Sequence, residues 1–264
     1  MTHQARKRFG QNFLHDQGII ANILAHAQPI PGQHWLEIGP GLGALTKPLL
    51  QSGVKLDVIE LDRDLVKHLQ NKFDGHGNLT VHSADALDFD FASLTASNEK
   101  LRVIGNLPYN ISTPLMFHLL ENSPCIQDMH FMLQKEVVDR ICADPGSKKY
   151  GRLSVMMQYY CETEWLFDVP PESFDPVPQV MSAIVKLVPH TRQPVQIKDL
   201  RSFKQLVTQA FSQRRKTIRN SLKNLLDEQQ MLALGIDPNL RAESLNLEQF
   251  ALLNLHSTAS DDQP

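Results

Sequence analysis

The first two-thirds of the chain alternates short apolar runs with stretches that carry apolar residues at helical spacing. The runs are rich in β-forming residues, which indicates strands, and the stretches between them predict amphipathic helices. This rhythm is typical of βαβ units, so we expect a doubly wound α/β sheet that is mostly parallel. The expected strands are residues 35–38, 56–59, 79–82, 101–104 and 129–133, and the expected helices are residues 19–27, 42–50, 63–73, 114–121 and 135–143.

The pattern changes twice in the remaining third. A helical stretch from about residue 152 is followed by two β-rich runs, residues 160–167 and 182–188, which flank a proline-rich loop and predict a hairpin that adds an antiparallel strand. Beyond Pro189 the pattern is helical, with helices expected at 203–211 and 218–226 and an apolar segment at 250–255. We therefore expect a sheet domain over residues 1–190, a small all-α domain over 191–258 and a disordered tail over 259–264.

Composition narrows the class of protein. The 264 residues are 42% hydrophobic and 21% charged, and no run approaches the roughly 18 apolar residues of a membrane helix. The basic N-terminus has no apolar segment after it, so we expect no secretory signal and a cytoplasmic protein. The three cysteines show no ligand-like spacing, and hence we expect neither a disulfide framework nor a metal site.

The net charge of −3 hides an uneven distribution. Residues 198–223 contain eight basic residues and one acidic residue, and smaller basic clusters occur at residues 6–8 and 148–152. Such patches favour phosphate binding, although a charged run on a solvated face is an equally simple interpretation.

A glycine-rich loop follows the first expected strand of the sheet. Gly39 and Gly41 permit a tight turn and a close approach of the backbone to a ligand at the start of a helix. With Ala44 they also satisfy the G-x-G-x-x-G/A pattern of dinucleotide-binding proteins. Glu60, at the end of the next strand, would pair with ribose hydroxyls in a dinucleotide or in another nucleoside cofactor. A nicotinamide cofactor and a purely structural turn therefore remain alternatives at this point.

Acidic residues around the loop favour another cofactor. Glu37 precedes Gly39, and Asp85 follows the third strand, so the set resembles the class I S-adenosylmethionine-dependent methyltransferases, which have a Rossmann-like sheet. The resemblance implies that Glu60 holds the ribose hydroxyls and that Asp85 meets the adenine amino group. Asp85 as a turn residue or helix cap is the simpler alternative.

A second motif follows the fourth strand and consists of Asn106, Leu107, Pro108 and Tyr109. At the carboxyl edge of the sheet, the Asn106 oxygen and the carbonyl of Leu107 or Pro108 could accept hydrogen bonds from an adenine amino group and expose its lone pair. Tyr109 offers a ring on which the base can stack. Phe174 on the proline-rich loop is a candidate for the opposite face of the base, with a buried core position as its alternative.

Through these motifs the chain resembles the ribosomal RNA adenine dimethyltransferases over nearly its whole length. Further matching segments are residues 9–14, 150–154 and 174–178. The resemblance implies S-adenosylmethionine as the cofactor, with Asn12 and Leu14 in its pocket beside Gly39, Gly41, Glu60, Asp85 and Asn106. It also implies that Tyr109 and Phe174 flank the target base.

Residues 150–154 and 211–220 resemble the small-subunit type of this family. That type implies dimethylation of two adjacent adenines near the 3′ end of 16S ribosomal RNA within an immature 30S subunit. We expect the protein to be a monomer that uses neither a metal nor a membrane. The helical domain would then bind RNA through Arg214, Arg215, Lys216 and Arg219. The competing hypotheses are large-subunit methylation or a mitochondrial-type transcription-factor role, a nicotinamide-dependent oxidoreductase, and a catalytically silent assembly factor.

Overall fold

The structure, a computed structural model, describes residues 11–96, 99–109, 111–121 and 123–257. Contacts divide the chain into two compact units. The first comprises residues up to Val138 together with Glu164–Pro189, and the second comprises Asp139–Thr163 together with the residues from His190 onward. Residues 139–163 thus pack with the C-terminal segment, which differs from the domain boundary expected at residue 190.

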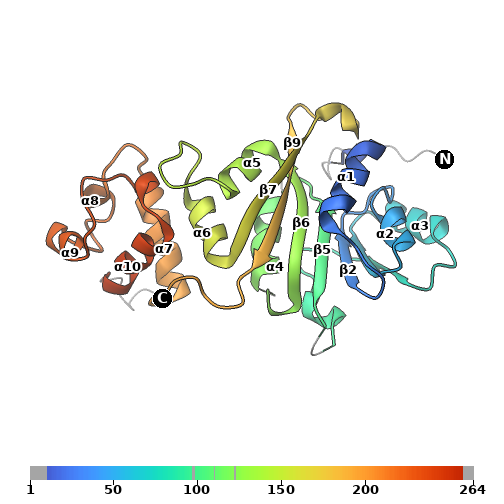
Figure 1. Cartoon of the computed structure of the whole chain (residues 1–264), viewed down its shortest axis with the longest axis horizontal. Coiled ribbons are helices and arrows are strands. Elements are labelled where there is room, and N and C mark those ends of the chain that lie inside the picture. Colours follow the sequence, from blue (N-terminus) through green and yellow to red (C-terminus); the bar gives the residue numbers. More distant parts are fainter. Residues whose placement is uncertain (1–10, 97–98, 110, 122, 258–264) are drawn as a thin grey trace. The chain divides into compact units, whose positions relative to one another are not determined.

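The first unit is built on a seven-stranded sheet with the order β4-β3-β2-β5-β6-β9-β7. Strands β2 to β6 pair in parallel and β9 pairs antiparallel to β6, as the hydrophobic pattern predicted. Figure 1 shows β2, β5, β6, β9 and β7 side by side. The strands are β1 Phe13–Leu14, β2 His34–Ile38, β3 Lys55–Glu60, β4 Leu79–Ser83, β5 Leu101–Asn106, β6 Ile126–Gln134, β7 Cys161–Val169, β8 Phe174–Asp175 and β9 Ser182–Pro189.

Side-chain hydrogen bonds fix where two helices of this unit begin. Asp16 caps α1 by accepting the N–H groups of Gly18 and Ile19, and Asp62 caps α3 in the same way through Asp64. The second helix starts at Thr46, four residues later than expected, because the preceding residues form the glycine turn. The helices are α1 Gln17–Ala27, α2 Thr46–Gln51, α3 Arg63–Lys72 and α4 Ser112–Glu121, and short 3₁₀ turns are η2 Phe91–Leu94, η3 Ser123–Cys125 and η4 Pro171–Ser173.

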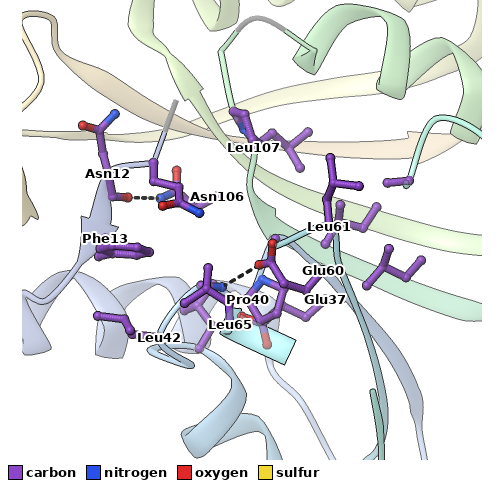
Figure 2. A pocket seen from close by; sticks show the side chains of 18 of the residues that line it. Asn12, Phe13, Glu37, Pro40, Leu42, Glu60, Leu61, Leu65, Asn106 and Leu107 are labelled. Carbon is purple, nitrogen blue, oxygen red and sulfur yellow. Dashed lines mark hydrogen bonds between the residues drawn. The ribbon is translucent and has the colours of Figure 1, made fainter. Parts of the chain in front are cut away.

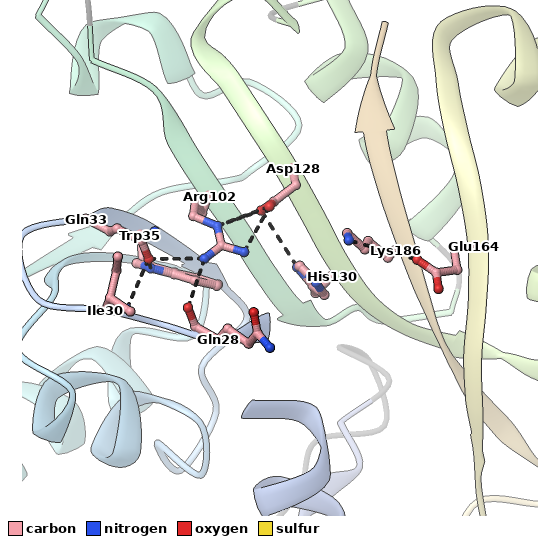
Figure 3. A network of polar contacts seen from close by, with 9 residues as sticks. All are labelled: Gln28, Ile30, Gln33, Trp35, Arg102, Asp128, His130, Glu164 and Lys186. Atoms are coloured by element: carbon pink, nitrogen blue, oxygen red, sulfur yellow. Dashed lines mark hydrogen bonds and ion pairs between the residues drawn. The ribbon is translucent and has the colours of Figure 1, made fainter. Parts of the chain in front are cut away.

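A buried ion pair joins β5 to β6 near the ends where these strands begin (Figure 3). Arg102 donates to both carboxylate oxygens of Asp128, with its Nη2 2.9 Å from Oδ2 and its Nε 3.0 Å from Oδ1. The guanidinium also donates to the Gln33 side chain and lies 4.3 Å from the ring centroid of Trp35. The Asp128 contacts join two strands of the sheet, and the Gln33 contact ties Arg102 to the segment between α1 and β2.

The second unit is helical around a small apolar core, as expected, but one predicted helix is wrong. The helix expected over residues 218–226 ends at Ser221, and the chain turns before a new helix begins. Asp227 and Gln230 cap each other's backbone N–H groups, which favours a helix start at this point. The helices from residue 135 onward are α5 Lys135–Ile141, α6 Arg152–Tyr160, α7 Leu200–Phe211, α8 Ile218–Ser221, α9 Glu228–Ala233 and α10 Leu247–His256, with η5 at Ala242–Ser244.

Candidate functional site

A cavity of about 320 Å³ opens at the carboxyl edge of the parallel sheet (Figure 2). Its walls come from the segments that follow β2, β3, β4 and β5, together with the strand β1 and the two residues before it. In open α/β sheets this edge is the usual position of a ligand site, and the volume is that of a small-molecule pocket. The sequence-predicted residues on its walls are Asn12, Leu14, Gly39, Gly41, Glu60, Asp85, Asn106, Leu107, Pro108 and Tyr109.

The glycine loop forms the turn between β2 and α2. Gly39 and Gly41 have φ angles of 68° and 56°, a backbone conformation that residues with a Cβ rarely adopt. The N–H of Gly39 donates to the carbonyl of Ile59 at 3.0 Å, which holds the loop against the end of β3. A Cβ at position 41 would stand 3.0 Å from the Phe13 ring. Glycine is therefore required here both by the turn and by the packing of β1 against it.

Glu60, the last residue of β3, directs its carboxylate toward this loop. Its Oε1 accepts the N–H of Asp62 at 2.9 Å, and its Oε2 accepts the N–H of Gly41 at 3.4 Å. The side chain is 8% exposed, and burial raises the pKa of the carboxyl despite these hydrogen bonds. Glu60 is therefore a buried carboxyl beside the glycine loop on the cavity wall.

A second buried carboxyl, Glu37, lies on the same cavity wall. It is 2% exposed, and the Thr46 hydroxyl donates to its Oε2 at 2.6 Å. Burial raises the pKa of Glu37 to about 7; the Thr46 hydrogen bond opposes this rise, and the nearby Glu60 carboxylate adds to it. The sequence singled out Glu37 as an acidic neighbour of the loop, whereas the structure makes it part of the lining.

Asp85 forms the local turn that the sequence analysis gave as the simpler alternative, and it also lies on the cavity wall. Its Oδ1 accepts the N–H of Leu87 at 2.9 Å, which is the hydrogen bond of a local turn. The residue also lines the cavity and is half-buried. A carboxylate held in this way keeps a second oxygen for a ligand.

Asn106 ends β5 and is fixed by a contact with a distant part of the chain. Its Nδ2 donates to the carbonyl of Asn12 at 2.9 Å (Figure 2), which leaves Oδ1 as the acceptor of the amide. The strand reaches this position because residue 105 is glycine, where a Cβ would stand 2.6 Å from the Ile38 carbonyl oxygen. Strand β5 therefore ends with an oriented amide group at the cavity wall.

The three residues after Asn106 form a turn anchored at each position. The N–H of Leu107 donates to Met132 at 3.2 Å, and the Pro108 carbonyl accepts the N–H of Ile111 at 3.1 Å. The Tyr109 hydroxyl lies 2.8 Å from the Ser182 hydroxyl, and burial raises the pKa of this tyrosine. Tyr109 is thus a neutral, half-buried ring held by β9 at the cavity wall.

The structure does not bring Phe174 to the cavity. Its side chain is 1% exposed and packs in the hydrophobic core, where β8 pairs antiparallel with β1 through Leu14. This is the core position that the sequence analysis gave as the alternative. With no exposed ring face, Phe174 supports Leu14 and the wall of the cavity rather than a base.

Phe13 and Leu61 are among the lining residues that reasoning from the sequence missed. Phe13 packs against Gly41, and Leu61, which is 49% exposed, follows Glu60 on the wall. Each adjoins a residue that the sequence did single out, and that adjacency was the available signal. Their side-chain directions depend on the turns of the backbone, which the pattern alone does not specify.

The four predicted RNA-binding residues lie in the second unit and are exposed. Arg214 donates to the carbonyl of Lys148 and lies 3.5 Å from Glu243, and Arg219 lies 3.5 Å from Glu228. Of these four side chains, Arg215 and Lys216 have no ion pair with any residue in the described part of the chain.

Among the described residues, no helix has the length and apolar character needed to cross a membrane. Within the same residues, no group of three or more histidine, cysteine, aspartate or glutamate side chains is arranged to hold a metal ion.

Comparison with known proteins identifies the family. The family model "Ribosomal RNA adenine dimethylase" matches residues 2–257. The chain is 57% identical over 251 residues, covering 95% of it and 94% of the relative, to the "Ribosomal RNA small subunit methyltransferase A" of Pseudomonas aeruginosa. It is 56% identical over 248 residues, covering 94% and 93% of the two chains, to the protein of the same name from a Marinomonas species.

Two solved structures agree with this assignment. A dimethyladenosine transferase from Plasmodium falciparum has a TM-score of 0.77 at 25% identity, with 91% of this chain and 95% of that chain covered. The 23S rRNA methyltransferase ErmE has a TM-score of 0.73 at 29% identity, with 92% and 98% covered. The sheet with its oriented Asn106, the matched length and these similarities lead to one conclusion: the chain belongs to the ribosomal RNA adenine dimethylase family.

Proposed function

We propose that this protein transfers methyl groups from S-adenosylmethionine to the N6 atoms of two adjacent adenines near the 3′ end of 16S ribosomal RNA. The substrate is an immature 30S subunit in the cytoplasm, and the enzyme acts as a monomer. The observation that carries the proposal is that Asn106 lies on the wall of the same cavity as the glycine loop, Glu60 and Asp85. Family membership and the small-subunit name of its 57% identical relative support the choice of RNA.

The residues present fit this cofactor. Glu60 would hold the ribose hydroxyls and Asp85 the adenine amino group, while the Gly39–Gly41 turn lets the backbone approach the ligand closely. Leu61 and Phe13 supply apolar wall on either side. S-adenosylmethionine, when bound, supplies an electrophilic methyl group on a sulfonium.

Asn106 and its neighbour would present the target nitrogen. The Asn106 Oδ1 is oriented by the Nδ2 bond to Asn12 and accepts one hydrogen of the adenine amino group. The Pro108 carbonyl already accepts the N–H of Ile111, so the Leu107 carbonyl is the better candidate for the second hydrogen. Two acceptors localise the lone pair on the nitrogen, which otherwise delocalises into the ring, and thereby make it a nucleophile.

No general base is needed in this scheme. A methylated adenine nitrogen that carries an extra proton is strongly acidic and releases it to water. Glu37 is buried and bonded to Thr46, and Tyr109 has a raised pKa, so neither is assigned proton transfer. The chain's contribution is alignment and hydrogen bonding, with the Tyr109 ring as a stacking surface for the base.

The decisive experiment uses labelled S-adenosylmethionine with unmethylated 30S and with 50S particles. We expect label in 30S particles only and dimethyladenosine in the mass spectrum of the digested RNA. Asn106→Ala should retain particle binding and lose about 100-fold or more in rate, as when one preorganised hydrogen-bonding group is removed. Asn239→Ala, an exposed asparagine in the second unit, is the matched control.

Each competing hypothesis has its own outcome. Label only in 50S particles would refute the choice of subunit, and unchanged methylation by Asn106→Ala would refute the role of that amide. Equilibrium binding of NAD in preference to S-adenosylmethionine would make the chain an oxidoreductase. Particle binding without any methylation by the unaltered protein would make it a silent assembly factor.

A further inference from the structure

Two exposed basic segments of the second unit lie against each other. One is the loop of residues 144–149, which contains Lys148 and Lys149, and the other is the turn of residues 212–217, which contains Arg214, Arg215 and Lys216. They are more than 60 residues apart in the sequence. Asp144 is the single acidic residue in the two segments.

A pair of aromatic rings anchors both segments at a common point. Tyr150 directly follows the loop and is buried, and Phe211, the last residue of α7, directly precedes the turn. Their ring centroids are 6.2 Å apart in an edge-on arrangement. Because each segment starts or ends at this contact, the loop and the turn emerge from the core side by side.

Arg214 links the two segments above this anchor. Its Nη2 donates to the backbone carbonyl of Lys148, and its Nε lies 3.5 Å from Oε2 of Glu243. The backbone of Glu243 in turn accepts the N–H of Gly146 at 2.6 Å. The guanidinium and one residue of η5 thus hold the loop from two sides.

Backbone hydrogen bonds fix the far end of the turn. The N–H of Ile218 donates to Leu240 at 2.8 Å, and the N–H of Arg219 donates to Pro238 at 3.1 Å. Ile218 itself is fully buried. The turn is therefore held at both ends, and its charged side chains project from a preformed surface.

The basic side chains of the loop and the turn differ in whether they form ion pairs within the protein. The Lys149 Nζ lies 2.6 Å from the Asp139 carboxylate, and Arg214 is engaged as described. For Lys148, Arg215 and Lys216, all exposed, no ion pair is shown within the described ranges. These three side chains are therefore the ones placed to meet an external anion.

We propose that Lys148 contacts the same RNA phosphate backbone as Arg215 and Lys216, and that Arg214 is a positioning residue that holds the Lys148 loop in place. The proposal rests on the proposed function for the identity of the polyanion as RNA. Phosphate contacts of this kind position an RNA without reading its sequence, so the surface would orient the particle. The sequence analysis placed Lys148 in a basic cluster that favours phosphate binding, but did not group it with the four residues of 214–219 expected to bind RNA.

The test is the salt dependence of binding by the full-length protein to unmethylated 30S particles and to naked 16S RNA. Removing one phosphate contact lowers the slope of log K against log salt by about 0.7 to 0.9. We expect this decrease for Lys148→Ala with both probes. Lys149→Ala, the adjacent lysine already paired with Asp139, is the matched control and should lower the slope by less than half as much. An unchanged slope for Lys148→Ala, an equal loss for Lys149→Ala, or an effect confined to particles would overturn the proposal.

The role of Arg214 is tested by a double-mutant cycle. If Arg214 acts through Lys148, Arg214→Ala must cost less affinity in the Lys148→Ala background than in the unaltered protein. Additive losses would overturn the positioning role, since independent contacts or general destabilisation add. Methylation of 30S particles by the unaltered protein is measured alongside. Its absence would refute the proposed function, whereas methylation with an unchanged Lys148→Ala slope would refute this inference alone.

Discussion

The buried carboxyl of Glu37 makes a quantitative prediction about stability. Its pKa is about 7 in the folded protein and 4.5 as the unperturbed value. The unfolded chain therefore releases this proton first, so the free energy of unfolding is highest below pH 4.5 and falls as the pH rises to about 7. A shift of this size corresponds to about 3 kcal/mol over the whole titration, and most of it falls between pH 5 and pH 8.

The substitution Glu37→Gln removes this titration and keeps the shape of the side chain, including an oxygen that accepts the Thr46 hydroxyl. The free energy of unfolding of the variant, relative to that of the unaltered protein, should therefore rise by about 2 to 3 kcal/mol from pH 5 to pH 8. Urea unfolding followed by tryptophan fluorescence measures it, because both tryptophans, Trp35 and Trp165, belong to the unit that holds the cavity. Glu162→Gln, at an exposed position on β7, is the control for the loss of a surface carboxyl.

A stability difference between Glu37→Gln and the unaltered protein that stays the same at pH 5 and pH 8 would refute this reasoning. It would mean that Glu37 ionises in the folded protein as readily as in the unfolded chain. Burial without a cationic partner would then not be the dominant influence on this carboxyl.

Three further substitutions test the framework of the site. Gly105→Ala places a Cβ 2.6 Å from the Ile38 carbonyl oxygen. We therefore expect the free energy of unfolding in urea to fall by about 1 to 3 kcal/mol and the rate of methylation to fall by a larger factor. Unchanged methylation activity would contradict this packing. Asp128→Ala leaves the buried Arg102 guanidinium without its carboxylate and should cost about 3 to 5 kcal/mol in the same assay, and a cost below about 1 kcal/mol would show that the pair is solvated. Tyr109→Ala should lower kcat/KM for 30S methylation by about 5- to 150-fold, the equivalent of 1 to 3 kcal/mol of stacking, while Tyr109→Phe should retain most activity; equal rates for Tyr109→Ala and the unaltered protein would exclude stacking.

Much of the first unit followed from local pattern. The strand and helix runs predicted a mostly parallel sheet of βαβ units, and the motifs after β2, β3, β4 and β5 lie together at one edge of that sheet. This convergence is a consequence of topology, since the carboxyl ends of parallel strands share an edge. The helix expected over residues 218–226 failed because apolar spacing says little about where a helix ends, and the reciprocal caps of Asp227 and Gln230 favoured a new start.

Contacts between distant residues were decided only by packing. Phe174 looks like an accessible aromatic in a rigid loop, yet the pairing of β8 with β1 buries it beside Leu14. The same holds for the raised pKa of Glu37, because desolvation depends on what covers a residue and not on its neighbours in the chain. Sequence proximity carries neither kind of information.

The amino-acid sequence by itself determined the fold class, the family and the two motifs around Gly39 and Asn106, because these depend on residue types at short spacing. Tertiary structure alone decided that the Asn106 amide is oriented by the Asn12 carbonyl, 94 residues away, and that the Arg214 guanidinium donates to the Lys148 carbonyl. The physical reason is that hydrogen-bond direction and burial arise where segments remote in sequence meet. A local pattern places a residue on an element, and only the packed chain determines what its side chain touches.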